Sequence, residues 1–280
     1  MRPTLFHLGP FPVHSFGVMV LAAFLLGLWY TLAQARKRMA GHDPEEPGVI
    51  TPEHVFDFAL TALFVCIIAA RVLYVALDLN EFQGRWTDVF KIWTGGLTVV
   101  GSIIIAPFYL WWYCRRHHLS FLSFADLCAP GFALGNAIGR IGCLLNGCCY
   151  GAPCSLPWAV RFADEHHPGL LTPPSHPTQI YETLMNLASF ALLHFWSKRP
   201  HKRGEIMLGF FGLYCVTRFV SEQFRKGATA DVPFHFGPVS LTDTQLFCAI
   251  VLPILLFALY RLRRTGAAEP SPVPREVPAS

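Results

Sequence analysis

The stretch VFDFALTALFVCIIAARVLYVAL (Val55–Leu77) is the most informative segment for the fold, and its only charged residues are Asp57 and Arg71. A helix needs roughly 20 mainly apolar residues to cross a bilayer, so this segment predicts a transmembrane helix. The whole chain shares this character. Hydrophobic residues make up 53% of it and charged residues 14%, against ~25% charged in soluble domains. This composition excludes a disordered chain, a collagen, a coiled coil and an ordinary soluble enzyme.

Six other segments predict six more spans. They are Val13–Gln34, Leu97–Tyr113, Phe121–Leu145, Gln179–Trp196, Ile206–Phe224 and Leu241–Tyr260. We therefore expect an all-α polytopic membrane protein with seven transmembrane helices. A single domain, 1–265, would hold all seven helices and the loop 151–178. The tail 266–280 is rich in Pro, Ala, Glu and Ser, so we expect it to be disordered.

Lysine and arginine in the loops predict the orientation, because they concentrate on the cytoplasmic side. One side would hold Arg36, Lys37, Arg38, Arg115, Arg116, Lys198, Arg199, Lys202, Arg203, Arg261, Arg263 and Arg264. The other side would hold only Arg2, Arg85, Lys91, Arg161, Arg225 and Lys226. The first side is therefore expected to be cytoplasmic, with the N-terminus outside and the C-terminus inside.

Ionisable residues inside the predicted spans cost ~2.5–3.5 kcal/mol each, so each needs a partner or a function. They are Asp57, Arg71, Asp126, Arg140, Glu182, Arg218 and Glu222. The direction of the spans places the arginines and glutamates in the outer half of the bilayer and the two aspartates near the inner face. Arg218 and Glu222 are four residues apart and could simply pair. The excess of positive charge favours an anion, and a lipid phosphate suits guanidinium groups at that depth.

The segment GNAIGRIGCLLNGCCYG (Gly135–Gly151) is rich in glycine. Gly135, Gly139 and Gly142 share about one helical face, which lets another helix or a ligand approach closely. Arg140, beside these small residues, could reach a headgroup. A tight helix crossing is the simpler interpretation of the glycines.

Four cysteines lie in or just after this segment: Cys143, Cys148, Cys149 and Cys154. Their spacing is not a standard zinc pattern, and the adjacent pair suits tetrahedral geometry poorly, so we expect no metal and no cofactor. A disulfide on an oxidising outer side and a plain packing role both stay open.

The glycine-rich segment resembles the signature of the bacterial prolipoprotein diacylglyceryl transferase family. Five more motifs fit in order: PVHSFGVM (Pro12–Met19), AARVLYV (Ala69–Val75), FKIWTGGL (Phe90–Leu97), HPTQIYE (His176–Glu182) and GEIMLGFFGLYCVTRFVSEQFR (Gly204–Arg225). The family moves a diacylglyceryl group from phosphatidylglycerol to the lipobox cysteine thiol of a preprolipoprotein, and glycerol phosphate leaves. The resemblance implies a multi-pass enzyme of the bacterial inner membrane, with loop 151–178 periplasmic. We expect a monomer that binds phosphatidylglycerol and preprolipoprotein signal peptides and no nucleic acid.

The resemblance also implies a site. The family's essential arginines fall on Arg140 and Arg218, its span-six tyrosine on Tyr214, and its Tyr-Glu pair on Tyr181 and Glu182. The arginines would hold the phosphate, Tyr214 would hydrogen-bond the headgroup or the thiol, and Glu182 or His176 would orient an arginine or accept a proton. Further residues expected to contact substrate are Arg71, His14, Gly139, Gly142, Asn146, Gly151, Tyr181, Glu222 and Arg225.

The chain departs from the family at several positions. Val100 stands where the family commonly has a histidine, Phe16 replaces a tyrosine, and Cys143 and Cys148 replace an asparagine and a glutamate. Two ways of activating the thiol therefore stay open, a field from the arginines or a substitute base such as His176. Two other functions also stay open, a lipid-binding paralogue and a lipid transporter or flippase. The absence of an internal repeat in the sequence argues against the transporter.

Overall fold

The computed structural model describes residues 4–8, 11–40, 43, 46, 48–82, 86–90, 96, 98–163, 170–225, 230–236 and 239–265. Seven long helices lie in this described part: α1 (Ser15–Met39), α2 (Pro52–Leu77), α3 (Val99–Arg116), α4 (Phe121–Asn146), α5 (Thr178–Trp196), α6 (Glu205–Gln223) and α7 (Asp243–Thr265). Each overlaps one predicted span. The helices α1, α2, α4 and α7 are long and apolar enough to cross a membrane. The prediction of a helical, multi-pass membrane protein is therefore confirmed, whereas the predicted tail 266–280 lies outside the described residues.

The chain packs as two compact units, which are described separately. Of the described residues, those within 1–31 and 125–265 form the first unit, and those within 32–124 form the second. This division concerns packing, so the single domain expected over 1–265 stays a prediction.

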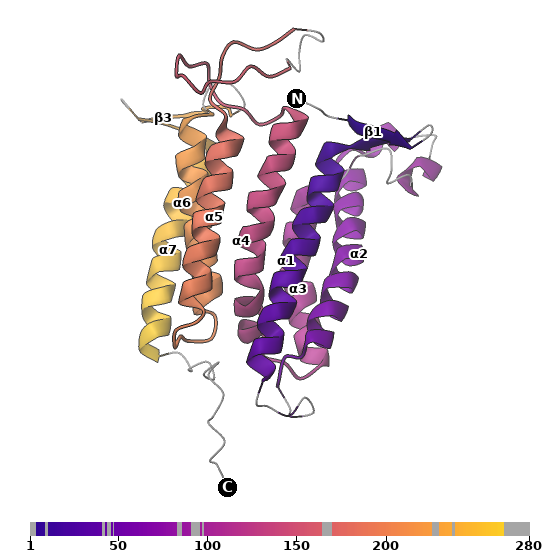
Figure 1. The fold of residues 1–280 in the computed structure, drawn as a ribbon, viewed down its shortest axis with the longest axis vertical. Helices are drawn as coiled ribbons and strands as arrows, with labels where there is room; N and C mark the ends of the chain where they lie inside the picture. The colour runs from indigo at the N-terminus through magenta and orange to yellow at the C-terminus, as the bar shows by residue number, and fades with distance from the viewer. Residues whose placement is uncertain are drawn as a thin grey trace. The chain divides into compact units, whose positions relative to one another are not determined.

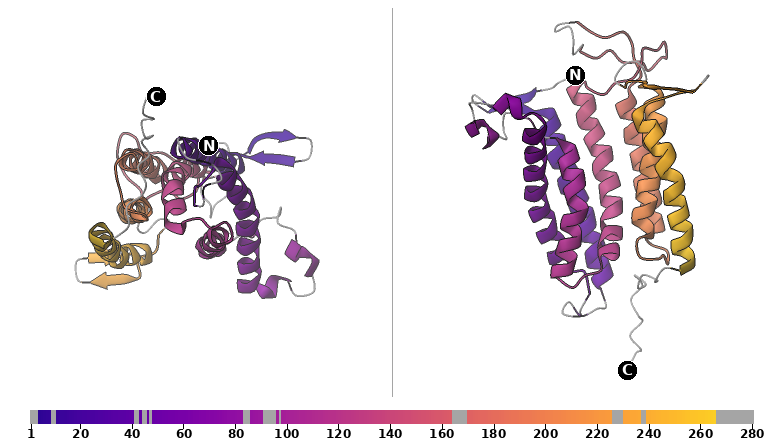
Figure 2. Two further views of the ribbon diagram at one scale, coloured as in Figure 1. Left: turned by 90° about the horizontal axis from the view of Figure 1, so that it is seen from below. Right: turned by 180° about the vertical axis from the view of Figure 1, so that it is seen from behind.

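In the first unit, α5, α6 and α7 lie side by side, as Figures 1 and 2 show. The start of α6 is held by a side chain from another helix. The buried Asp126 carboxylate on α4 accepts hydrogen bonds from the backbone N–H groups of Gly204 (2.6 Å) and Met207 (2.8 Å). These N–H groups belong to the first turn, where a helix supplies no partner of its own. Asp126 therefore fixes where α6 begins.

A second polar contact joins the same ends of α5, α6 and α7. The Glu205 carboxylate accepts hydrogen bonds from Arg263 Nε at 3.0 Å and Nη2 at 2.8 Å, and from the Trp196 indole at 3.0 Å. Charge-assisted contacts of this kind are the strong ones among side-chain hydrogen bonds. Glu205 thus ties the last turns of α5 and α7 to the first turn of α6.

In the second unit, α2 packs against α3 through a close backbone approach. Gly101 lies so near the Ala69 carbonyl oxygen that a Cβ at this position would collide with it. Arg71, near the end of α2, is buried and donates to three backbone carbonyls, those of Asp88 (2.6 Å), Val89 (2.8 Å) and Gly96 (2.9 Å). Its guanidinium therefore organises the chain that follows α2.

Two short antiparallel hairpins, which were not predicted, accompany the helices. The strands β1 (Thr4–Leu8) and β2 (Phe11–His14) form one, and β3 (Phe234–Phe236) and β4 (Val239–Leu241) form the other. Short 3-10 helices, η1 (Leu79–Phe82) and η2 (Trp86–Phe90), follow α2. In both hairpins the sequence between the strands is Gly-Pro, a dipeptide typical of turns. That signal could have indicated the hairpins.

Candidate active site

Five charged side chains from α4, α5 and the end of α6 form a continuous chain of ion pairs in the first unit. Arg140 Nε lies 2.6 Å from Glu182 Oε2, and Arg218 Nη1 lies 3.5 Å from Glu182 Oε1. Arg218 Nη2 then lies 3.2 Å from Glu222 Oε2, and Arg225 Nη1 lies 3.6 Å from the same oxygen. The pairing of Arg218 with Glu222 along one helix is confirmed, and it is one link of this larger chain.

The burial of these five side chains is uneven, and the more exposed ones can contact a ligand. The side chains of Glu182 and Glu222 are 2% and 5% exposed, whereas that of Arg140 is 23% exposed. Three arginines against two glutamates leave one positive charge in excess. The ion pair of Arg140 with Glu182 is formed through Nε. The guanidinium also carries two Nη groups, and guanidinium groups of this kind bind phosphate well.

The glycines of α4 set the surroundings of Arg140. A Cβ at Gly142 would lie 3.0 Å from the Met19 side chain and 3.4 Å from Phe16, so this glycine allows α1 to approach α4. A Cβ at Gly139 would meet no described atom within 4 Å. The helix crossing predicted for the glycines therefore occurs at Gly142, and Gly139 leaves open space beside Arg140.

The turn after α4 is bound to the start of α5 and the end of α6. The Gly151 N–H donates to the His176 carbonyl at 2.9 Å, and the Ala152 N–H donates to the Phe224 carbonyl at 2.7 Å. A Cβ at Gly151 would collide with Phe224 O and would lie 2.8 Å from side-chain atoms of His176 and Thr178. Gly151 is thus needed for this close approach of three chain segments.

Aromatic side chains surround His176 at the same end of the helices. His176 Nδ1 lies 3.3 Å from the Tyr181 hydroxyl, which also accepts a hydrogen bond from the Trp158 indole at 2.8 Å. The rings of His176 and Tyr181 lie 5.2 Å and 5.3 Å from that of Phe224. The two predicted residues therefore form one cluster, which Trp158 and Phe224 complete.

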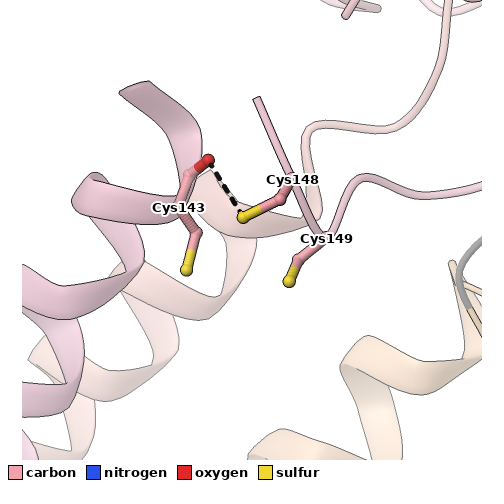
Figure 3. Close-up of side chains that lie close together, drawn as sticks. All are labelled: Cys143, Cys148 and Cys149. Atoms are coloured by element: carbon pink, nitrogen blue, oxygen red, sulfur yellow. Dashed lines mark hydrogen bonds between the residues drawn. The ribbon is translucent and has the colours of Figure 1, made fainter. Parts of the chain in front are cut away.

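Three cysteine sulfurs lie close together at the end of α4 and in the turn that follows it, as Figure 3 shows. Cys143 lies in the last turn of α4, and Cys148 and Cys149 lie in the turn that follows. Their Sγ atoms all lie within 4.8 Å of one another. Cys149 has φ 63°, a left-handed conformation that is uncommon for any residue except glycine. The sequence spacing alone did not predict this convergence.

Two residues that sequence reasoning missed hold the cysteine turn in place. The Thr178 hydroxyl donates to the Cys149 carbonyl at 2.6 Å, and the Gln179 amide donates to the Cys148 carbonyl at 2.6 Å. Both side chains are fully buried. Their position in the first turn of an otherwise apolar helix was the available signal, because such polar groups need partners when buried.

The other predicted residues are more dispersed. Tyr214 lies on α6, one turn before Arg218, and is exposed. His14 is exposed at the end of β2, and Asn146 is exposed at the end of α4. Arg71 and Val100 belong to the second unit, where carbonyl groups engage the guanidinium of Arg71 and Val100 is exposed. Contact of these residues with a substrate stays a prediction.

A cavity of about 840 Å³ lies at the other end of α5 and α6, beside Trp196, Lys202, Glu205 and Arg263. Glu205 and Arg263 there pair with each other and tie helices together. The ion-pair chain instead holds a partly exposed arginine, Arg140, and an excess of positive charge. It is therefore the better candidate for chemistry.

Comparisons with known proteins identify the family of the chain. A family model described as prolipoprotein diacylglyceryl transferase matches residues 3–261. The chain is 32% identical to the phosphatidylglycerol–prolipoprotein diacylglyceryl transferase of Nitratidesulfovibrio vulgaris strain Miyazaki F, over 95% of each chain. It is also 32% identical to the protein of the same name from Gloeobacter violaceus, over 96% of each chain. The chain therefore belongs to the prolipoprotein diacylglyceryl transferase family.

Proposed function

We propose that this chain transfers the diacylglyceryl group of phosphatidylglycerol to the lipobox cysteine thiol of preprolipoproteins and releases glycerol phosphate. The names of its relatives support the reaction. The observation that carries the proposal is Arg140, whose Nε lies 2.6 Å from a buried glutamate while its side chain stays 23% exposed, so that its Nη groups would bind an anion. A phosphodiester is an anion that these two donors fit.

The chemistry is a displacement at a glycerol carbon. The substrate sulfur attacks that carbon, the bond from carbon to phosphate oxygen breaks, and the electron pair leaves with glycerol phosphate. Negative charge grows on the phosphate as the bond breaks. A guanidinium that is already in place stabilises this charge more strongly than water does, because no reorganisation is needed during the reaction.

Each charged residue then has a role. Arg140 binds the phosphate directly, and Arg218, which is 14% exposed, adds positive charge from the next position along the chain. Glu182 orients both arginines. Glu222 and Arg225 complete the chain, and Tyr214 hydrogen-bonds the headgroup from beside Arg140. The positive surroundings favour the thiolate of the substrate, which is the nucleophilic form.

The loops support a defined orientation in the bacterial inner membrane, with all seven helices crossing it. The twelve lysines and arginines at the ends of α1, α3 and α7 and between α5 and α6 would be cytoplasmic, and the N-terminus and loop 151–178 periplasmic. The ion-pair chain lies near the start of α5 and the end of α6, so it would face the outer leaflet. The enzyme would act there as a monomer.

Transfer in a purified system tests the proposal. Full-length protein in detergent would be mixed with phosphatidylglycerol and a lipobox peptide, and the peptide mass followed. The expected result is a diacylglyceryl adduct on the peptide cysteine and none on a peptide with serine in its place. Binding of phosphatidylglycerol without adduct would indicate the lipid-binding paralogue. Movement of labelled lipid between leaflets of a vesicle, without adduct, would indicate a flippase.

A further inference from the structure

The cysteine cluster of Cys143, Cys148 and Cys149 has the dimensions of a metal site. Its three sulfur atoms lie within 4.8 Å of one another. At a Zn–S distance of ~2.3 Å, tetrahedral sulfur ligands lie about 3.8 Å apart, so only a small adjustment would bring all three onto one ion. Thiolate ligands select soft or borderline cations, of which Zn²⁺ is the common one with this geometry.

The cluster is preformed by its surroundings. The carbonyls of Cys148 and Cys149 are each held at 2.6 Å by the buried side chains of Gln179 and Thr178. Cys149 is kept at φ 63°. Backbone strain of this kind persists only where neighbouring groups enforce it, and it concentrates at functional sites. The Gln179 Oε1 atom is also buried without a hydrogen-bond partner among the described residues.

The cluster also leaves a ligand position open. Cys154 is the next cysteine along the chain, but its sulfur is not in the described group. Zinc sites with four protein ligands are structural, whereas sites with three protein ligands keep a fourth position for water or substrate. A three-cysteine site in this chain is therefore of the second kind.

Its position next to Arg140 matches the chemistry. Cys143 follows Arg140 by three residues on α4, which places both on the same side of the helix.

We propose that Cys143, Cys148 and Cys149 bind one Zn²⁺ ion and that its fourth position takes the lipobox cysteine as a thiolate. This inference rests on the proposed function. Binding to zinc releases the proton of the substrate thiol to solvent. The zinc-bound sulfur then forms the bond to the glycerol carbon, the electron pair of the broken C–O bond leaves with the phosphate on Arg140, and the thioether product dissociates.

Such a site supplies the activation that a general base would otherwise provide. A thiol with a pKa of ~8.5 is only about one-tenth ionised near pH 7.5, so a bound cation that ionises it fully gains about tenfold from this effect alone.

Metal binding is tested on the full-length protein in detergent, reduced and then stripped with a chelator. Co²⁺ serves as the probe, because cobalt bound to thiolates absorbs strongly in the near ultraviolet. We expect one Co²⁺ per chain with this absorption, displaced by Zn²⁺. Cys143→Ser and Cys149→Ser should lose the band, and Cys154→Ser should keep it. Thermal melting of each variant without metal checks that it folds.

The substrate position is tested by adding a lipobox peptide to the cobalt form. The visible absorption should shift with the cysteine peptide and stay unchanged with its serine variant. Transfer should fall about tenfold after stripping, with a rate that rises toward pH ~8.5, and added Zn²⁺ should restore it. Cys143→Ser should lower transfer by a similar factor and should not respond to Zn²⁺.

The outcomes separate this inference from the proposed function. Stripped protein and Cys143→Ser that transfer lipid at the full rate would overturn the zinc site and leave the transferase intact. Metal uptake and a peptide-induced shift without any transfer would overturn the transferase and leave the zinc site. No metal uptake after reduction, with two of the sulfurs joined as a disulfide in untreated protein, would also overturn the zinc site.

Discussion

The Nε atom of Arg140 lies 2.6 Å from Oε2 of Glu182, a carboxylate whose side chain is only 2% exposed. This contact joins α4 to α5 and fixes one edge of the guanidinium. The other carboxylate oxygen lies 3.5 Å from Arg218 Nη1, so a single buried glutamate orients two arginines from different helices. The site is therefore assembled by charge pairing between helices.

Loss of either arginine should stop lipid transfer. Arg140→Ala and Arg218→Ala remove positive charge that meets the developing phosphate charge, and transfer should fall by about 10²–10³-fold. Arg140→Lys should also lose transfer activity. A guanidinium can contact Glu182 through one edge and a phosphate through another, whereas the lysine ammonium is a single point charge. The measurement is adduct formation on a lipobox peptide at matched amounts of folded protein. Arg199→Ala is the control, since Arg199 is exposed at the far end of α5.

Glu182→Gln should destabilise the protein as well as inactivate it. The substitution leaves Arg140 and Arg218 without their shared counter-charge in a poorly hydrated site. Removing one partner of a buried pair costs roughly 3 kcal/mol here, the low end of the usual range, because Arg140 keeps some exposure. Thermal melting in detergent would measure this loss. Replacing the exposed Glu46 by Gln should leave the melting temperature unchanged, and equal shifts in both variants would contradict the account.

Asp126 and Asp57 form a matched pair for testing the start of α6. Both aspartates were expected near the inner face of the membrane. Asp126 is fully buried and accepts hydrogen bonds from two backbone N–H groups, whereas Asp57 is exposed. Asp126→Ala leaves these donors unsatisfied and should lower the free energy of unfolding by about 2 kcal/mol. Asp57→Ala should change it little. A smaller loss for Asp126→Ala than for Asp57→Ala would show that the capping contact is unimportant.

The sequence predicted the helices well because long apolar runs leave few alternatives to a helix. Predicted and observed ends differ by at most five residues, as for α1 (predicted end Gln34, observed end Met39) and α7 (Tyr260 and Thr265). Both helices continue through basic residues such as Arg36 and Arg261. Hydropathy ends the predicted span before these residues because they are charged, although arginine is a good helix former. Hydropathy therefore locates the apolar core of each helix better than its end.

The ion-pair chain was only partly predictable. Depth along the spans grouped Arg140, Arg218, Glu182 and Glu222, which the structure brings together, because the rise per residue is constant in a helix. It also placed Arg71 in this group, whereas Arg71 belongs to the second unit. Depth does not give the rotation of one helix against another, so the sharing of Glu182 by two arginines could not be inferred. The convergence of Cys143 with Cys148 and Cys149 depends on the left-handed turn at Cys149, which has no sequence signature.

Site-directed labelling should establish the orientation. Lys198→Cys, in a background without native cysteines, should resist an impermeant thiol reagent in sealed cells and react after lysis. Ser155→Cys in the loop 151–178 should react in both. Both positions are exposed, whereas His201 in the same loop as Lys198 is only 6% exposed and would report poorly. Labelling of Lys198→Cys in sealed cells would reverse the proposed orientation.

His176 should prove dispensable for proton transfer. Its backbone binds Gly151 and Ala152, its Nδ1 atom lies 3.3 Å from the Tyr181 hydroxyl, and its ring packs against Phe224. These contacts give it a structural role. His176→Gln keeps a polar group near Tyr181, so the variant should transfer lipid with an unchanged pH profile and a slightly lower melting temperature. Val100→His should bring little benefit, because a second source of activation is redundant when the thiol is already ionised.

The decisive measurement is the dependence of kcat/KM on pH, which reports groups of the free enzyme. A limb near the histidine pKa of ~6.5 that is present in the unsubstituted protein and absent in His176→Gln would identify His176 as the base. In that case the cysteine cluster would not be the source of thiol activation.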